Sequence, residues 1–227
     1  VHNLYGAMMT KAGAQGMKSF NPDKRHLLFS RASFIGAHRD GGVWQGDNFS
    51  WWSHILLNMR ELAGMNMCGF LYTGADLGGF GCNTTEDLLL RWLQLGVFTP
   101  LMRNHAALGT RDQEIYRFRN WEQMRDTLTV RYALIPFLYS ELVKAAVKDD
   151  MLFRPLAFDY PVDKRACRVE DQLMLGESVM IAPVLTQNAT GRYVYLPEEM
   201  KLLRLRSATD FDEEILPKGH HYVPCQL

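Results

Sequence analysis

The feature that most constrains the fold is an alternation, between residues 1 and 150, of short apolar runs with segments of helical spacing. The apolar runs predict buried strands at His26–Ser33, Met67–Tyr72 and Val97–Arg103. The helical patterns cover, in chain order, Leu4–Ala14 ending at Gly16, about Ser50–Leu62, Glu86–Leu95 and Trp121–Lys148. Such alternation is typical of parallel βα units.

The longest predicted helix, Trp121–Lys148, carries an apolar stripe at helical spacing. Asn120 and Gln123 form a pair like a capping box at its start. Pro136 lies inside it and is expected to kink it. A second proline, Pro100, weakens the third strand prediction because it removes a ladder donor.

The pattern changes near residue 150. Three strand-like segments follow, at Met151–Phe158, Ser178–Leu185 and Arg192–Leu196. The turn-forming residues 187–191 separate the last two, which are therefore expected to pair as antiparallel neighbours. The sequence thus predicts two domains, at residues 1–150 and 151–227.

Charge and cysteine usage exclude several classes of function. Lys+Arg and Asp+Glu both number 25, and this balance argues against a nucleic-acid or anionic-membrane partner. It suits a neutral polar ligand such as a sugar. No apolar stretch is long enough for a transmembrane helix. The cysteines lack metal-ligand spacing, so no metal site is predicted, and Cys68 is expected to be a buried small hydrophobe.

Functional side chains of parallel βα proteins gather at the carboxyl ends of strands and in the loops that follow. The segments at such places are 30–33, 44–48, 72–80 and 103–105. They combine Arg, Asp, Trp, Phe and His with small residues. Aromatic faces stack on the C–H faces of sugar rings, while the polar side chains hydrogen-bond hydroxyls, so this set predicts a sugar pocket.

Ordinary structural roles remain open for the polar residues. Asp47 and Asn48 both precede a predicted helix, and either is a candidate for its N-cap. Arg31 at a strand end is a candidate salt-bridge partner. Asp76 is placed to hold a turn, and a lone His105 is more often structural than catalytic.

The aromatic residues have structural alternatives too. Trp44 is a candidate core residue, and Phe80 an ordinary hydrophobe in a glycine-rich turn. Trp51 and Trp52 are both expected to pack in the core or against a helix.

Taken together, these segments resemble glycoside hydrolase family 31. The resemblance covers roughly Val1 to Pro197 and rests on the order and spacing of F-S-R-A-S-F, W-Q-G-D-N, Y-T-G-A-D-L-G-G-F, F-T-P-L-M-R-N-H, R-Y-A-L-I-P-F-L-Y, R-P-L and G-E-S-V-M-I-A-P-V. It implies the second half of a (β/α)8 TIM barrel, an α/β fold, followed by the beginning of an antiparallel β-sandwich domain.

The resemblance also implies site residues. Asp47 matches the general acid/base of a retaining α-glucosidase, and no cofactor is implied. The positions matching the −1 sugar subsite are Arg31 and His105 for the hydroxyls, Trp44 and Phe80 as aromatic walls, and Asp76 near the pocket floor. In this mechanism two carboxyl groups about 5–5.5 Å apart act in turn, one as nucleophile and the other as proton donor.

The family's nucleophilic aspartate has no counterpart in these residues, since Asp23 and Asp40 lie in the wrong context. The last 30 residues also depart from the family pattern. A half barrel leaves open sheet edges. We therefore expect an N-terminal remainder carrying the nucleophile as a partner, and an isolated chain without activity.

Other readings stay open. They are an α-xylosidase, lyase or transglycosylase of the same family, a carbohydrate-binding homologue without turnover, and a structural fragment. An oligosaccharide is the expected ligand. Linkage preference, a possible homo-oligomer and the compartment remain undecided, with the cytoplasm favoured.

Overall fold

The first part of the chain is built on short parallel strands that follow one another in sequence and in space. In the computed structural model, which describes residues 2–225, β1 (Phe29–Ser30) pairs with β2 (Gly42–Trp44), and β2 pairs with β3 (Thr73–Gly74). β4 (Asp76–Leu77) begins one residue beyond β3 and pairs with β5 (Arg103–Asn104). The parallel strands thus form the short sheets β1-β2-β3 and β4-β5, and one residue separates β3 from β4 along the chain.

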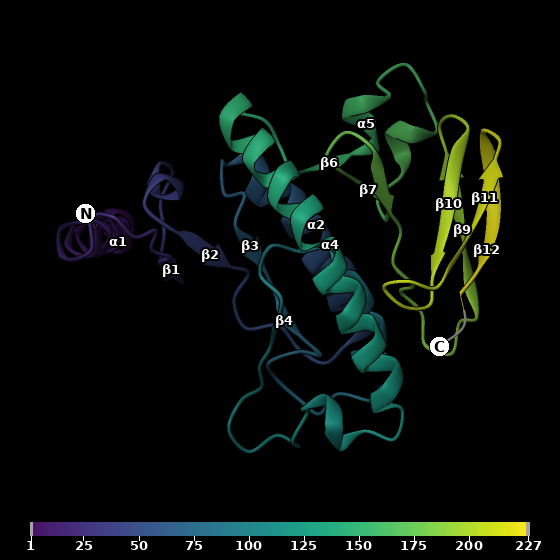
Figure 1. Ribbon diagram of the computed structural model, residues 1–227, viewed down its shortest axis with the longest axis horizontal. Helices are drawn as coiled ribbons and strands as arrows, with labels where there is room; N and C mark the ends of the chain where they lie inside the picture. Colours follow the sequence, from purple (N-terminus) through teal and green to yellow (C-terminus); the bar gives the residue numbers. More distant parts are fainter. Residues whose placement is uncertain (1, 226–227) are drawn as a thin grey trace.

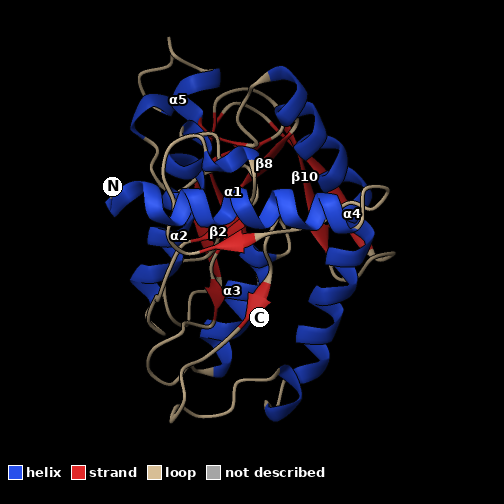
Figure 2. Cartoon of the chain, turned by 90° about the vertical axis from the view of Figure 1, so that its left-hand side faces the viewer, coloured by secondary structure: helices blue, strands red, loops and turns tan. Residues whose placement is uncertain are grey.

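Helices accompany these strands. They are α1 (His2–Phe20), α2 (Trp52–Met67), α3 (Glu86–Gly96) and α4 (Trp121–Lys148), with short 3₁₀ turns at Ala37–Arg39 and Ile115–Arg117. α1 precedes β1, α2 connects β2 to β3, α3 connects β4 to β5, and α4 follows β5. α1 lies at one end of the molecule, and the antiparallel hairpins lie at the other end (Figure 1). Seen from that first end, α1 crosses in front of the rest of the chain (Figure 2).

The second part is antiparallel. β6 (Phe153–Pro155), β7 (Leu173–Leu175) and β8 (Val179–Ile181) form one sheet, with α5 (Leu156–Asp159) and a 3₁₀ turn at Ala166–Arg168 between β6 and β7. β9 (Gly191–Leu196) pairs with β12 (Gly219–Pro224), and β10 (Met200–Leu205) pairs with β11 (Phe211–Leu216).

One hydrophobic core joins the two parts. Ile55 of α2, Trp92 of α3 and Phe153 of β6 are fully buried in the same cluster. Asn66 of α2 also accepts the backbone N–H of Phe153 at 2.7 Å. Burying this shared apolar surface makes the packing of α2 and α3 depend on the sheet that follows them.

A buried arginine makes a second connection. Arg91 of α3 is 1% exposed, and its guanidinium donates to the carbonyls of Cys225 at 2.7 Å and Ala189 at 3.0 Å. A buried charge needs such partners to offset its desolvation. The guanidinium thus fixes the backbone at Ala189 and Cys225 against α3.

The strand predicted at Met67–Tyr72 is wrong. α2 continues to Met67 because its buried stripe extends through Leu62 to Asn66, and the strand begins only at Thr73. Gly69, with φ of 87°, makes the turn between them. Four other predicted strands are shorter than expected. Of His26–Ser33, Val97–Arg103, Met151–Phe158 and Ser178–Leu185, only residues 29–30, 103, 153–155 and 179–181 are in strands.

The predicted pairing of Ser178–Leu185 with Arg192–Leu196 is wrong as well. β8 pairs with β7 and β9 pairs with β12, which lies beyond the region where the sequence shows clear alternation. The helices α3 and α4 are confirmed, α3 ending at Gly96. Asn120 precedes α4, but its side chain makes no capping hydrogen bond.

Two burial predictions also fail. Cys68 is exposed because it follows the last residue of α2 at the surface. Trp51 is 52% exposed, whereas Trp52 packs against the core as expected. The predicted boundary near residue 150 stays a prediction, and Val1 and residues 226–227, at the outer ends of the two predicted domains, lie outside the described residues.

Candidate functional site

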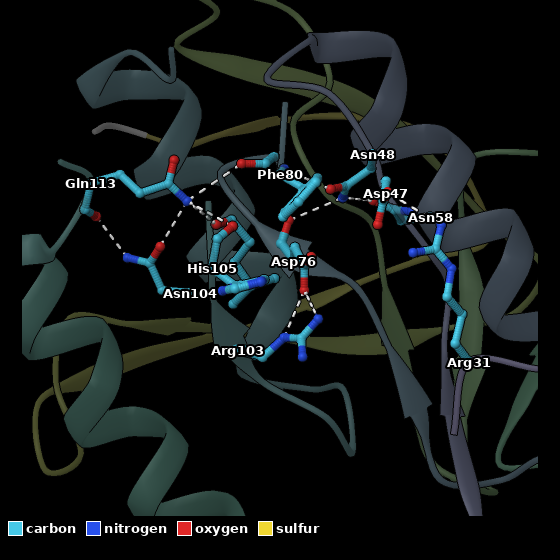
Figure 3. A network of polar contacts seen from close by, with 12 residues as sticks. Arg31, Asp47, Asn48, Asn58, Asp76, Phe80, Arg103, Asn104, His105 and Gln113 are labelled. Carbon is cyan, nitrogen blue, oxygen red and sulfur yellow. Dashed lines mark hydrogen bonds and ion pairs between the residues drawn. The ribbon is translucent and has the colours of Figure 1, made fainter. Parts of the chain in front are cut away.

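The polar residues singled out in the sequence gather at one edge of the parallel strands. Arg31 follows β1, Asp47 lies three residues after β2, Asp76 is in β4 and His105 follows β5. Parallel strands end at the same edge, so these side chains, far apart in sequence, face a common region (Figure 3).

Asp47 and Arg31 form an ion pair at the exposed side of this region. Arg31 Nη2 lies 3.2 Å from Asp47 Oδ2, and the side chains are 61% and 42% exposed. An exposed ion pair contributes little to stability. Either partner is therefore able to exchange the other for a ligand at small cost.

Asp76 and Arg103 form a second pair, and this one is buried on the carboxylate side. Asp76 is 1% exposed, and Arg103 donates to its Oδ1 from Nε at 2.7 Å and from Nη2 at 2.5 Å. Burial raises the pKa of Asp76, and the hydrogen bonds and charge of Arg103 oppose that rise. A carboxylate so enclosed orients Arg103 and does not itself present an oxygen to solvent.

Trp44 stands between the two pairs. The guanidinium carbons of Arg31 and Arg103 lie 5.6 and 5.4 Å from its ring, and Phe29 stacks on it with centroids 5.9 Å apart. Cation–π attraction of this kind fixes both arginines relative to the indole. The half-buried Trp44 therefore acts as the common wall of the region.

Phe80 and His105 form the other wall. Their ring centroids are 5.3 Å apart, and the N–H of Ala107 donates to the carbonyl of Phe80 at 2.8 Å. His105 is exposed, and its ring is available to a ligand.

Asn48 anchors the loop that carries Asp47. Its side chain is buried and donates to Asn58 Oδ1 at 2.8 Å and to the carbonyl of Asp76 at 3.0 Å. Its Oδ1 accepts the N–H of Phe80 at 2.9 Å. One amide thus links the loops after β2 and β4 to helix α2.

The N-cap alternative for Asp47 and Asn48 is wrong. The residue that precedes α2 is Trp51, four positions beyond Asp47. Asn48 uses its amide for the contacts above, and Asp47 faces Arg31. The helix start therefore does not explain why an aspartate stands at position 47.

Sequence reasoning included Arg103 in a candidate segment but gave it no role, and it missed Asn58 and Gln113. Gln113 Nε2 lies 2.8 Å from Asn104 Oδ1 and 3.2 Å from the carbonyl of His105. Arg103 was detectable from its place at a predicted strand end. Asn58 and Gln113 have no such signal, because Asn58 lies inside a helix and Gln113 lies well beyond the end of a strand.

A cavity of about 830 Å³ opens between α4 and the loop after β5, and its lining includes His105, Gln113 and Arg131. Neither Asp47 nor Arg31 lines it, so it adjoins the site without enclosing the ion pair.

Two general findings concern residues 2–225. No three His, Cys, Asp or Glu side chains in that range lie close enough together to hold a metal ion. None of its helices has the length and apolar character needed to cross a membrane.

Two family models match the chain. Residues 1–141 match the TIM-barrel domain of glycosyl hydrolases family 31, and residues 149–223 match the C-terminal domain of the same family.

Curated relatives are similar over most of this chain. Alpha-glucosidase 2 of Bacillus thermoamyloliquefaciens is 38% identical over 200 residues, which is 87% of this chain and 25% of that protein. Lysosomal alpha-glucosidase of Rattus norvegicus is 40% identical over 202 residues, which is 88% of this chain and 21% of that protein. The chain therefore spans a quarter or less of the length of these relatives.

Solved structures are similar over almost the whole chain. A glucosidase II alpha subunit in its alpha3-Glc2-bound form gives a TM-score of 0.84 at 28% identity, covering 96% of this chain and 25% of that one. A Flavobacterium johnsoniae GH31 dextranase complexed with glucose gives a TM-score of 0.86 at 25% identity, and the match covers 99% of this chain and 29% of that one.

Proposed function

The chain belongs to glycosyl hydrolase family 31, and from this we propose that Asp47 is the general acid/base of a retaining α-glucosidase whose nucleophile lies outside residues 1–227. The fold class predicted from the sequence is confirmed, since a family barrel domain is followed by the family's C-terminal domain. The proposed substrate is an oligosaccharide with terminal α-linked glucose, as the names of the relatives suggest.

The observation that carries the proposal is the position of Asp47. It is a half-exposed carboxylate at the carboxyl edge of parallel strands, held by an exposed arginine and not used by the fold as a helix cap. Of the two aspartates that the sequence singled out at this edge, Asp76 is buried behind Arg103, so Asp47 is the one that a ligand reaches.

The proposed reaction has two steps. In the first, the nucleophile attacks the anomeric carbon of the terminal sugar while Asp47 gives its proton to the glycosidic oxygen, so the leaving sugar departs as an alcohol. In the second, Asp47, now a carboxylate, takes a proton from water, whose oxygen attacks the anomeric carbon and breaks its bond to the nucleophile, which leaves as a free carboxylate. Both inversions together retain the anomeric configuration.

The neighbouring side chains have distinct proposed roles. Arg31 and His105 bind hydroxyls of the sugar being cleaved, and Trp44 and Phe80 cover its C–H faces. Asp76 holds Arg103 against Trp44 and acts from behind the pocket. The exposed Arg31–Asp47 contact would be exchanged for substrate contacts on binding, which its low cost allows.

Substitution of Asp47 in the full-length protein tests the acid role. Asp47→Ala is expected to lower kcat/KM for a disaccharide by roughly 10²–10⁴-fold, because a sugar alkoxide leaves poorly without a proton. α-Glucosyl fluoride needs no protonation, so its cleavage should fall far less. Azide needs no general base and should restore turnover as α-glucosyl azide.

The matched control is Asp212→Ala, which removes another exposed aspartate paired with an arginine, at 2.5 Å. It should leave both substrates unchanged. Equal losses on both substrates in Asp47→Ala, without azide rescue, would contradict the acid role. The proposed place of the nucleophile also requires that residues 1–227 alone release no nitrophenol from p-nitrophenyl α-glucoside.

A second candidate function, α-xylosidase or transglycosylase activity within the family, is decided by the same assay. Faster cleavage of p-nitrophenyl α-xyloside, or transfer products in excess of free glucose, would replace the α-glucosidase assignment while leaving the role of Asp47 intact.

A further inference from the structure

Two aromatic rings are exposed immediately after the proposed acid. Phe49 and Trp51 are 41% and 52% exposed, and their rings stack with centroids 5.0 Å apart and planes inclined by 20°. Neither ring belongs to a hydrophobic cluster of the described residues. Two adjoining large rings in contact with water are a common mark of a binding surface.

The surrounding structure holds the rings in place. His54 packs edge-on against both, with centroids 5.8 and 5.2 Å away, and its Nδ1 accepts the N–H of Phe49 at 3.0 Å. The N–H of Ser50 donates to the carbonyl of Gly81 at 2.9 Å. A surface fixed before binding loses little freedom when a ligand arrives.

The surface is also uncharged. Burial lowers the pKa of His54, so the imidazole between the rings is neutral at physiological pH. Two aromatic faces beside a neutral imidazole match the C–H face and hydroxyls of a neutral sugar better than they match an ion.

The position of the pair relative to Asp47 indicates which sugar it meets. Asp47 and Phe49 are both exposed, while Asn48 between them is buried, so the side chains of Asp47 and Phe49 both reach the solvent side of the loop after β2. The chain then leads through Trp51 into α2, away from the strand ends. A general acid faces the oxygen that joins the cleaved sugar to the leaving group, and the leaving group lies on its outer side.

We propose that Phe49 and Trp51 form the binding surface for the leaving group, stacking on the second and third rings of an α-linked glucose oligosaccharide. This inference rests on the proposed role of Asp47. It adds a preference for chains of three or more sugars, since a disaccharide reaches only the nearer ring, Phe49.

The test compares two substrates in the full-length protein. Maltotriose has a leaving group of two sugar rings, whereas α-glucosyl fluoride has none. In Trp51→Ala, the ratio of kcat/KM for maltotriose to kcat/KM for the fluoride should fall roughly tenfold, as expected for the loss of one aromatic stacking surface. Trp51→Phe should keep most of the wild-type ratio.

The matched control is Trp121→Ala, which removes another exposed tryptophan, at the start of α4 beside Arg125. Its ratio should equal the wild-type ratio. An unchanged ratio in Trp51→Ala overturns the inference, and so does an equal loss on both substrates with a lowered Tm, which would make the pair a packing surface for another part of the protein.

The two proposals fail in different ways. A wild-type protein that cleaves neither substrate contradicts the proposed function and, with it, this inference. A wild-type protein that cleaves both, with a Trp51→Ala ratio like its own, contradicts this inference alone.

Discussion

Ion pairs of similar length occur in both parts of the molecule, and only their surroundings distinguish them. Arg31–Asp47 spans 3.2 Å at the edge of the parallel strands, and Arg204–Glu214 spans 2.8 Å across the antiparallel hairpin β10–β11. In the first pair, Arg31 lies over the indole ring of Trp44, and the two partners follow different parallel strands, β1 and β2. The second joins strands that are already paired in register.

The comparison shows what strand direction does for polar residues. In the parallel part, strands of two or three residues place their polar side chains at the strand ends or in the loops that follow, where these side chains face a common region (Figure 3). In the hairpin, the strands have six residues and the charges spread along the face of one ladder. The parallel part thus concentrates chemistry, and the hairpin distributes surface charge.

The largest expected difference is in catalysis. Arg31→Ala in the full-length protein should lower kcat/KM for a disaccharide by roughly 10²–10³-fold, because the lost donor acts on the sugar in the transition state. Arg204→Ala should leave kcat/KM unchanged. Steady-state kinetics with both variants, checked for equal Tm, measure this, and near-wild-type kcat/KM in a folded Arg31→Ala protein would make the arginine a surface salt-bridge partner only.

A second difference concerns stability. Asp76→Ala should lower the free energy of unfolding by about 2–4 kcal/mol, because a buried acceptor of two guanidinium bonds is lost. Asp210→Ala removes bonds of 2.6 and 2.8 Å from Arg206 in the hairpin, yet it should lower the free energy of unfolding far less than Asp76→Ala does, because that pair is exposed to solvent. Urea unfolding curves of the two variants would refute the contrast if their losses were equal.

The smallest expected effect depends on pH. Asp163 accepts from Lys218 Nζ and from Tyr195 Oη, both at 2.7 Å, and these bonds hold the pKa of Asp163 well below its usual value of 3.8. A carboxyl group whose pKa is lower in the folded than in the unfolded protein stabilises the fold fully at pH values above its unfolded pKa. This stabilisation is lost progressively as the pH falls from the unfolded pKa through the folded pKa. The Tm advantage of wild type over Asp163→Asn should therefore be larger at pH 7 than at pH 3.

A constant Tm difference across that pH range would mean that packing, and not charge, accounts for the role of Asp163. Lys201→Ala is the matched control, since its bond to Glu213 is exposed on both sides and should give a small difference at both pH values.

Sequence patterns identified what depends on local chemistry. Periodicity located α3 and α4, and strand ends followed by small residues located the edge where Arg31, Asp47 and His105 gather. The family resemblance and the fold class were confirmed by the family models. The proposed roles of the individual site residues stay predictions.

Patterns failed where a distant partner decides the structure. The apolar run after Met67 looked like a strand, but Asn66 holds it as a helix end by bonding the carbonyl of Phe70 and the N–H of Phe153. β9 pairs with β12, a strand 23 to 33 residues further along the chain that the sequence pattern did not predict, and its six residues Gly219–Pro224 include glycine and proline, which are untypical of strands. Asn58 was missed because it lies inside α2, where no motif marks it, and only the fold brings it to the side chain of Asn48 in the loop before that helix.

The backbone contact between the two site loops has a consequence for engineering. The carbonyl of Asn48 accepts the N–H groups of Phe80 and Gly81 at 3.0 and 2.8 Å, and Gly79 leaves no room for a side chain against Ser50. A graft that replaces residues 45–51 with a relative's segment therefore has to bring residues 78–82 from the same donor. Designers who vary substrate preference should treat the two loops as one cassette.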